Sequence, residues 1–168
     1  MIEPDKVIRN IIIEEMGIDP DRIVVYDQDW KPPTDKELYI MIAGPASSKI
    51  ISSVNKFIPG IGILPDKEVK YIVSQEVYNV EITSKNTSAK LRRFEINAAM
   101  ISTFSVQQQE ENEMSIFRAS QNMDLSFIEG GSSLHRYRIP VIINSMKTYE
   151  KEITTFNSFQ EPQEVIDA

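Results

Sequence analysis

The side chains that could support acid–base or nucleophilic catalysis do not form a catalytic motif such as a Gly-x-Ser-x-Gly nucleophile elbow. The chain has one histidine, His135, and no cysteine. His135 stands beside Arg136 at the start of an expected strand, whereas a general base needs an orienting partner and a pocket. We therefore expect a polar structural role for His135. An enzyme that would use His135 with Asp124 or Glu129 is the third of three functional hypotheses.

The sequence also lacks the motifs of metal-binding and phosphate-binding sites. Without cysteine there is no thiolate metal site and no disulfide, and one imidazole cannot form a histidine cluster. Asp27 and Asp29 could both reach one cation, but the spacing of an EF-hand loop is missing. Gly60-Ile61-Gly62 lacks the third glycine and the following helix of a phosphate-binding loop. The sequence therefore predicts no catalytic residue, no cofactor and no metal ligand.

The composition is that of an ordinary globular protein. Of 168 residues, 41% are hydrophobic and 26% are charged, which suits a single domain with its own core. Acidic residues outnumber basic residues by 25 to 18, and the net charge is −7. Broad binding to nucleic acid is disfavoured, because it needs a surplus of Lys and Arg to neutralise phosphates. No apolar run is long enough to cross a bilayer, and the first residues do not resemble a secretory signal.

The best-formed unit of the sequence runs from Glu76 to Gln109. Its first part alternates apolar and polar residues, which is the period of a half-buried strand. After Asn86 the apolar spacing changes to three and four, which predicts an amphipathic helix of about five turns. The apolar stripe should pack on the sheet, and the basic face should stay free for a neighbouring chain. The stripe is Leu91, Phe94, Ala98 and Ile101, and the basic residues are Lys90, Arg92 and Arg93.

Other stretches predict the remaining layers of an α/β unit. A helix should begin at Pro4 and end at Gly17, with its apolar stripe in the core. Two short strands, at 22–26 and 38–42, are close enough in sequence to pair as an antiparallel hairpin. Residues 69–82 predict either one bulged strand or two strands joined by a turn. The strongest strand is 134–146, in which Pro140 indicates an edge position or a bulge.

Residues 43–66 form the least regular part of the pattern. Two prolines and two glycines interrupt an apolar run near its end, so we expect a long loop here. Its apolar side chains favour packing against a surface over full disorder. One reading is an arm that reaches a neighbouring subunit, and the other is a loop folded on its own domain. The two readings have about equal weight.

Four short segments stand out in sequence order: Tyr26–Pro33, the strand-to-helix unit Val80–Arg93, Gln107–Glu110, and Asp124–Gly130 leading into Leu134–Ile139. In this order they resemble parts of the neck and tail-terminator proteins of tailed bacteriophages. The resemblance covers most of residues 20–160. Residues 44–65 have no counterpart in the family.

The resemblance implies an α+β fold, in which two main helices pack on a mixed, mostly antiparallel β-sheet. It also implies one domain over residues 1–160, with 161–168 as a flexible tail. Proteins of this family form homo-hexameric rings that cap the tail tube and meet the head-side connector, and they do not catalyse a reaction. The expected partners are thus other copies of the chain, the tail-tube protein and a connector or neck protein. DNA would only pass through the ring, in a virion assembled in the host cytoplasm.

A ring needs two different patches on each subunit that meet head to tail. Candidate patches are the stretch 43–66 and the strand edge near Pro140. The candidate interface residues are Trp30, Phe57, Ile58, Ile61, Ile63, Leu64, Lys90, Arg92, Arg93, Arg136 and Arg138. The alternative from another class is a non-enzymatic module that binds a peptide or protein through an exposed strand edge.

Overall fold

The structure is a computed structural model that describes residues 3–25, 35–61, 65–117, 122–129 and 132–153. Within these residues the helices are α1 (Pro4–Met16), α2 (Ser88–Ala99) and α3 (Thr103–Glu111), with a 3-10 turn at Pro20–Arg22. The strands are β1 (Ile23–Val25), β2 (Tyr39–Ile58), β3 (Asp66–Ser84), β4 (Met114–Phe117), β5 (Met123–Asp124), β6 (Phe127–Glu129) and β7 (Ser132–Ile153).

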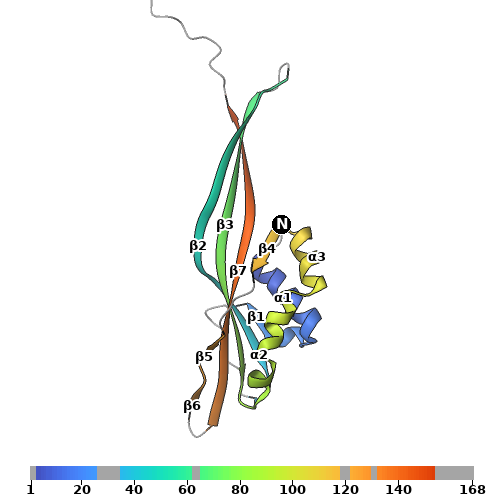
Figure 1. Cartoon of the computed structure of the whole chain (residues 1–168), viewed down its shortest axis with the longest axis vertical. Coiled ribbons are helices and arrows are strands. Elements are labelled where there is room, and N and C mark those ends of the chain that lie inside the picture. Colours follow the sequence, from blue (N-terminus) through green and yellow to red (C-terminus); the bar gives the residue numbers. More distant parts are fainter. Residues whose placement is uncertain (1–2, 26–34, 62–64, 118–121, 130–131, 154–168) are drawn as a thin grey trace, which may run out of the picture.

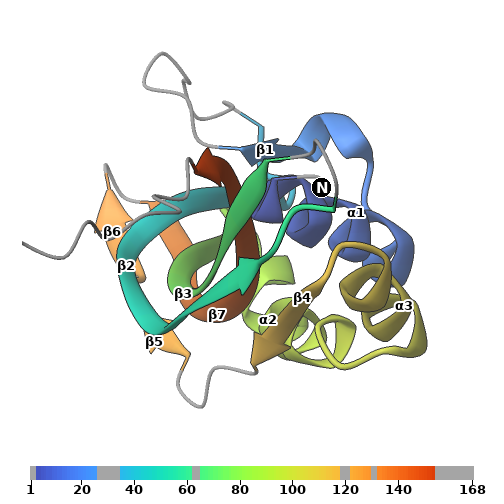
Figure 2. The ribbon, with the colours of Figure 1, turned by 90° about the horizontal axis from the view of Figure 1, so that it is seen from above.

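The fold is a single-domain α+β fold with a mixed, mostly antiparallel sheet, as the sequence predicts. The strand order is β1-β2-β3-β7-β4, and β5 and β6 pair with β7 separately. The helices lie on one side of the sheet and β5 and β6 on the other (Figures 1 and 2). The long strands β2, β3 and β7 continue past the helices in one direction, so the molecule consists of a helical body and a projecting sheet.

The core lies between the helices and one face of the central strands. β3 and β7 pair without a register shift from Asp66 opposite Ile153 to Ser84 opposite His135. Alternate side chains of both strands therefore point at the helices, and each fully buried aliphatic side chain stabilises the fold by roughly 1.5–3 kcal/mol. The buried residues on this face include Tyr78, Val80, Ile82, Tyr137, Ile139, Val141 and Ile143, and α1 adds Val7, Ile8, Ile11, Ile12 and Met16.

Helix α1 confirms the predicted start and end signals. Pro4 occupies the first turn, and Gly17 adopts a left-handed φ of 59° and donates its N–H to the carbonyl oxygen of Ile13. Arg9 then ties the helix to the sheet edge. Its Nε donates to the carbonyl of Ile23 at 3.2 Å, and its Nη2 donates to the carbonyl of Pro20 at 2.8 Å.

The prediction of an antiparallel hairpin between the first two strands is wrong. β1 pairs with β2 in parallel, with Ile23 opposite Ile40 and Val25 opposite Ile42. A parallel pair needs a connection of a dozen or more residues, and residues 26–38 are long enough for one. Sequence proximity alone could not distinguish the two directions.

The prediction of a long loop at 43–66 is also wrong, because β2 continues to Ile58. The strand absorbs its irregular residues at two register shifts against β3, between Ala43 and Ser47 and between Ile50 and Ser52. Gly44 lies at the first shift, where a Cβ atom would come within 2.5 Å of Cδ1 of Tyr78. Glycine is needed there because the aromatic ring fills the space that any other side chain would enter.

The phase change within residues 69–82 has a simple cause. β3 is one continuous strand and has no shift against β7, so neither a bulge in β3 nor a turn is present. Apolar residues at even positions face the helices in the body, whereas Val69, Tyr71 and Val73 lie on the opposite face farther out. The strand changes its buried face where it leaves the body.

The predicted five-turn helix is two helices, α2 and α3. The break falls at Met100–Ser102, where the Ser102 hydroxyl accepts a hydrogen bond from the N–H of Ser105 at 3.0 Å and caps α3. The hydroxyl of Ser105 donates to the carbonyl of Met100 at 2.8 Å and fixes the corner. The fold consequently has three helices in the described residues rather than the two main helices expected.

Candidate interaction surfaces

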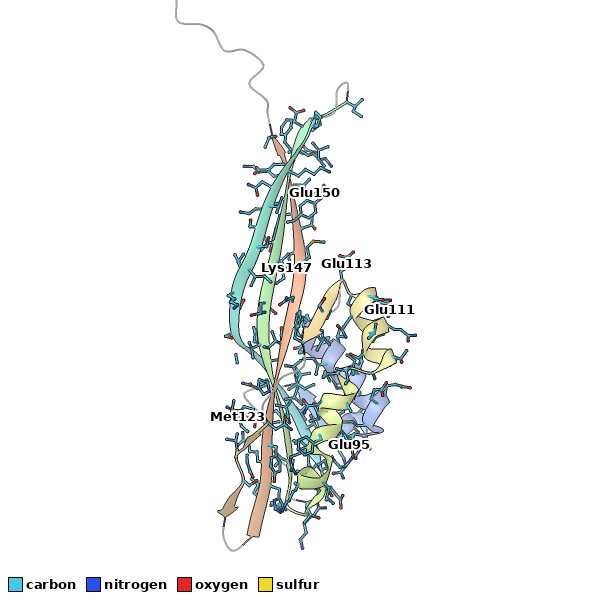
Figure 3. All side chains as sticks on the ribbon, in the orientation of Figure 1. Glu95, Glu111, Glu113, Met123, Lys147 and Glu150 are labelled. Carbon is cyan, nitrogen blue, oxygen red and sulfur yellow. The ribbon has the colours of Figure 1, made fainter. Side chains whose placement is uncertain are left out.

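The most unusual feature of the molecule is the part of the sheet that projects beyond the helices, which we call the arm. It consists of residues 50–58 of β2, 66–74 of β3 and 145–153 of β7. The arm is roughly 30 Å long at about 3.3 Å per residue. It extends away from the body (Figure 1), and Glu150 lies farther out than all three helices (Figure 3).

The arm exposes large apolar side chains on both of its faces. Ile50 is 65% exposed and Phe57 is 52% exposed, and they share the face that also carries Tyr149. Val54, Ile58 and Met146 are exposed on the other face. Apolar patches of this kind mark contact surfaces in folded proteins. The prediction placed Phe57, Ile58 and Ile61 at an interface, and all three are exposed in the structure.

The arm also has two open strand edges. β1 pairs with β2 only at residues 40–42, and β4 pairs with β7 only at residues 142–145. In the described part of the chain, no strand pairs with the outer edge of β2 at 50–58 or of β7 at 146–153. An open edge presents unpaired N–H and C=O groups to another chain.

The edge of the body is treated differently. At β4, the side-chain Oε1 of Gln109 accepts a hydrogen bond from the backbone N–H of Ile116 at 2.7 Å. Because this bond satisfies a backbone N–H on the outermost strand of the sheet, the side chain of Gln109 from α3 covers the edge of β4 at this point.

Pro140, which lacks an N–H, lies in β7 between the residues that pair with β5 and those that pair with β4. This position agrees with the predicted local edge.

Helix α2 carries a second exposed apolar surface, and here the predicted orientation is wrong. Leu91 is 74% exposed, Phe94 is 60% exposed and Ile101, in the following turn, is 57% exposed. The residues of this helix that face the core are Ala89, Ile96 and Ala99. At 3.6 residues per turn the two sets lie on opposite sides of the helix. We call Leu91, Phe94, Ala98 and Ile101 the outer stripe of α2.

The three basic residues of α2 are not a free cationic face. Arg92 donates to the carbonyl of Met16 at 2.7 Å and pairs with Glu95 at 2.7 Å. Arg93 lies over the rings of Phe94 and Tyr137, with its Cζ 4.4 and 5.1 Å from their centroids. Lys90 is exposed. Lys90 and Arg93 line a groove of about 480 Å³, together with Phe94, Asn97, Asn122, Asp124 and Tyr137.

Arg136 and Arg138 have a partner within the chain. Both donate to Glu81, a carboxylate on the face of the sheet away from the helices that is only 2% exposed. The Nε of Arg136 lies 2.7 Å from Oε2 of Glu81, and the Nε of Arg138 lies 2.7 Å from Oε1. The two arginines keep about a third of their side chains exposed. Their first role is to neutralise a buried charge, and only their outer parts can meet another molecule.

A second groove of about 480 Å³ lies where the arm leaves the body. α3 and β4 form one wall, with Val106, Gln109, Glu110, Glu113, Met114 and Ser115, and the sheet forms the other with Val73, Asn144, Ser145 and Met146. Glu111 and Glu113 stand at the arm side of the helices, near the height of Lys147 in the view of Figure 3. Lys147 itself lies 3.7 Å from Glu76.

Two of the residues considered for catalysis, His135 and Asp124, lie on the paired strands β7 and β5. His135 lies opposite Ser84 in the β3–β7 ladder, and Asp124 accepts a hydrogen bond from the N–H of Ser126 at 2.9 Å. The hydrogen bond from the Ser126 hydroxyl, followed by this backbone hydrogen bond, holds the pKa of Asp124 below its ordinary value. The described residues contain no group of three or more His, Asp or Glu residues that could hold a metal ion.

Some predicted positions lie outside the described residues. These are Trp30, Ile63, Leu64, the aspartates at 27 and 29 and the tail at 161–168. The Glu129 side chain is also outside the description. Among the helices that the structure describes, none is long and apolar enough to cross a membrane.

Neither a protein-family model nor a curated protein sequence matches this chain. The geometry of the two exposed apolar surfaces, the arm and the outer stripe of α2, therefore carries the functional argument.

Proposed function

We propose that this chain is a ring-forming structural subunit of a bacteriophage virion, which caps the tail tube and joins it to the head-side connector. The ordered resemblance to neck and tail-terminator proteins supports the biological setting. The arm supports the role of a subunit. The proposed ring would contain only copies of this chain, with six copies as the number that the resemblance implies.

The arm is the single observation that carries the proposal. A three-stranded sheet with apolar side chains on both faces and two open edges is poorly suited to remain in water. Its two edges belong to different strands, β2 and β7, so one copy offers two different surfaces. Two different surfaces are what a head-to-tail contact requires, and such contacts close into rings when the rotation between copies allows it.

The outer stripe of α2 gives each subunit a further contact surface on its body. Leu91 and Phe94 are large, apolar and exposed, and they lie on the side of the helix away from the sheet. In the proposed assembly each subunit must also bind the tail tube or the connector, and this surface is available for that contact.

Mass spectrometry of purified virions tests the proposal directly. The virions are purified from the bacteriophage whose genome encodes this chain. An epitope tag added to the chain allows gold labelling in the electron microscope. We expect peptides of the chain in the virions and label at the junction of tail and head. Complete absence of the chain from intact virions would refute the proposal.

A module that binds an extended peptide is the second candidate. The open outer edge of β2 favours it, because a peptide could add there as an extra strand. Such a module would stay monomeric and saturate at one peptide per chain. A concentration-dependent increase in mass without any peptide distinguishes the ring subunit from this module.

A further inference from the structure

We propose that a second copy of this chain places its β2 along the free edge of β7, in parallel orientation, so that the arms join into a closed barrel. The inference rests on the proposed function and deepens it by naming the strands that meet. The surfaces involved are residues 146–153 of one copy and residues 50–58 of the next.

The direction of the contact follows from the topology. β2 and β7 are both antiparallel to β3, so they run in the same direction in one arm. A rotation that continues the sheet from one copy to the next keeps this direction, and β7 meets the next β2 in parallel. A two-fold axis would instead bring β2 against β2, or β7 against β7, in antiparallel orientation. The two types of assembly therefore differ in a measurable way.

The side chains on the two edges are complementary on a shared face. Register through β3 places Ser52, Val54 and Lys56 of β2 in the same rows as Met146, Thr148 and Glu150 of β7. Lys56 would thus approach Glu150 or, with the stagger that a barrel requires, Glu152. Val54 would add apolar contact beside Met146, which is 38% exposed in the single copy.

The opposite face is complementary as well. Phe57 and Ile50 of β2 share it with Lys147, Tyr149 and Lys151 of β7. An aromatic ring beside Tyr149 gains from ring–ring contact, and one beside a lysine gains from cation–π contact.

A second copy fits these edges better than a peptide. A peptide on one edge leaves the other open, whereas a ring of copies pairs both edges of every subunit and leaves no edge in water. The edges are also of similar length, because both run beside the same stretch of β3. The body edge at β4, in contrast, is covered by the side chain of Gln109.

Disulfide cross-linking tests the proposal, and the absence of native cysteine makes each introduced cysteine the only reactive thiol. One set of single variants carries Met146→Cys, Thr148→Cys or Glu150→Cys. The other set carries Ser52→Cys, Val54→Cys or Lys56→Cys. All six positions are exposed, so each variant should unfold at the same temperature as the parent protein within a few degrees. Mixed pairs of variants are oxidised, and the yield of cross-linked dimer is measured.

We expect cross-links in the mixtures of the two sets and little in either set alone, because the contact joins different strands. As the cysteine in β7 moves from 146 to 150, the best partner in β2 should move in the same direction, toward 56. A chain carrying one cysteine of each kind should give a ladder that ends at a closed ring. A disulfide needs Cα atoms about 4.4–6.8 Å apart, so the partner positions are narrowly defined.

Two other results would overturn the inference. Efficient cross-linking within one set, or a best partner that moves in the opposite direction, would show an antiparallel contact. In that case the arms do not make the head-to-tail contact, and the presence or absence of the chain in virions tests the proposed function separately. A monomeric protein that gives no specific cross-link, also with assembled tail tubes present, would count against both.

Discussion

At the scale of single residues, the best-defined interaction is the carboxylate of Glu81 between Arg136 and Arg138. Glu81 is 2% exposed, and each arginine donates to one of its oxygens. A buried carboxylate is costly unless it is paired and hydrogen-bonded. The alternation of β7 predicts from the sequence that Arg136 and Arg138 point away from the core. Their bonds to Glu81 explain why two arginines stand at these positions.

Replacing this carboxylate should be destabilising. We expect Glu81→Gln to lower the free energy of unfolding by about 2 kcal/mol, because it removes a charge that two arginines share in a buried place. Urea denaturation measures the change. Glu150→Gln is the matched control, since Glu150 also pairs across strands, with Lys67 at 3.4 Å, but is exposed. Its effect should stay below about 0.5 kcal/mol. Equal effects of the two substitutions would contradict the assigned role of Glu81.

The second residue-scale prediction concerns pH. Burial of Tyr78, followed by the 2.8 Å hydrogen bond from its Oη to Glu76, raises the pKa of the phenol well above its ordinary value. The neutral phenol is thus favoured in the folded state. Its contribution to stability is complete below the unfolded pKa of about 10 and is lost as the pH rises through that value toward the folded pKa.

The free energy of unfolding should therefore fall more steeply above about pH 10 in the parent protein than in Tyr78→Phe. Urea titrations at a series of alkaline pH values give the two slopes. Tyr149→Phe is the control, because it removes the hydroxyl of a tyrosine that is 56% exposed. If all three proteins show the same slope, the Tyr78 phenol does not contribute as described.

At the scale of the elements, α2 provides the sharpest test of the fold. Ile96 is fully buried, whereas Leu91 is 74% exposed. We expect Ile96→Ala to lower the free energy of unfolding by about 2–5 kcal/mol, because it leaves a cavity in the core. Leu91→Ala should change it by no more than about 0.5 kcal/mol. The reverse order, measured by urea denaturation of each variant, would mean that the helix faces the other way.

The same helix shows what sequence periodicity can and cannot predict. The spacing of Leu91, Phe94 and Ala98 correctly predicts a helix, but α2 has apolar residues on two faces. The core face uses Ile96 and the small residues Ala89 and Ala99, which allow close approach to the sheet, whereas Leu91 and Phe94 remain outside. Periodicity identifies an apolar stripe without showing what covers it.

The strands show a similar division. The alternation in β7 correctly predicts its core face, and α1 follows its proline and glycine signals. The length of β2 was not predictable, because Gly44 and Pro45 read as a loop until the register shifts against β3 are known. The bonds of Glu81 to Arg136 and Arg138 were equally unpredictable from the sequence. They join residues more than fifty positions apart, which only strand pairing brings together.

At the scale of the whole molecule, the chain combines a well-packed body with an arm that has no core of its own. Residues of the arm are held by strand pairing and by few buried side chains, such as Val69. A sheet of this shape gains stability when other copies pair with its edges and cover its apolar side chains. In the proposed assembly, the arm and the outer stripe of α2 make the contacts with other chains, and the body positions both.

The most direct test of this account is the mass of the protein in solution, measured by sedimentation equilibrium over a wide concentration range. The parent protein should form one closed oligomer of defined size. This oligomer should form on its own at high concentration or, if assembly needs a nucleus, once tail tubes are added. The variant Ile50→Glu/Phe57→Glu, changed only at exposed positions of the arm, should keep the fold and remain monomeric. A parent protein that stays monomeric at every concentration, also in the presence of tail tubes, would contradict the account.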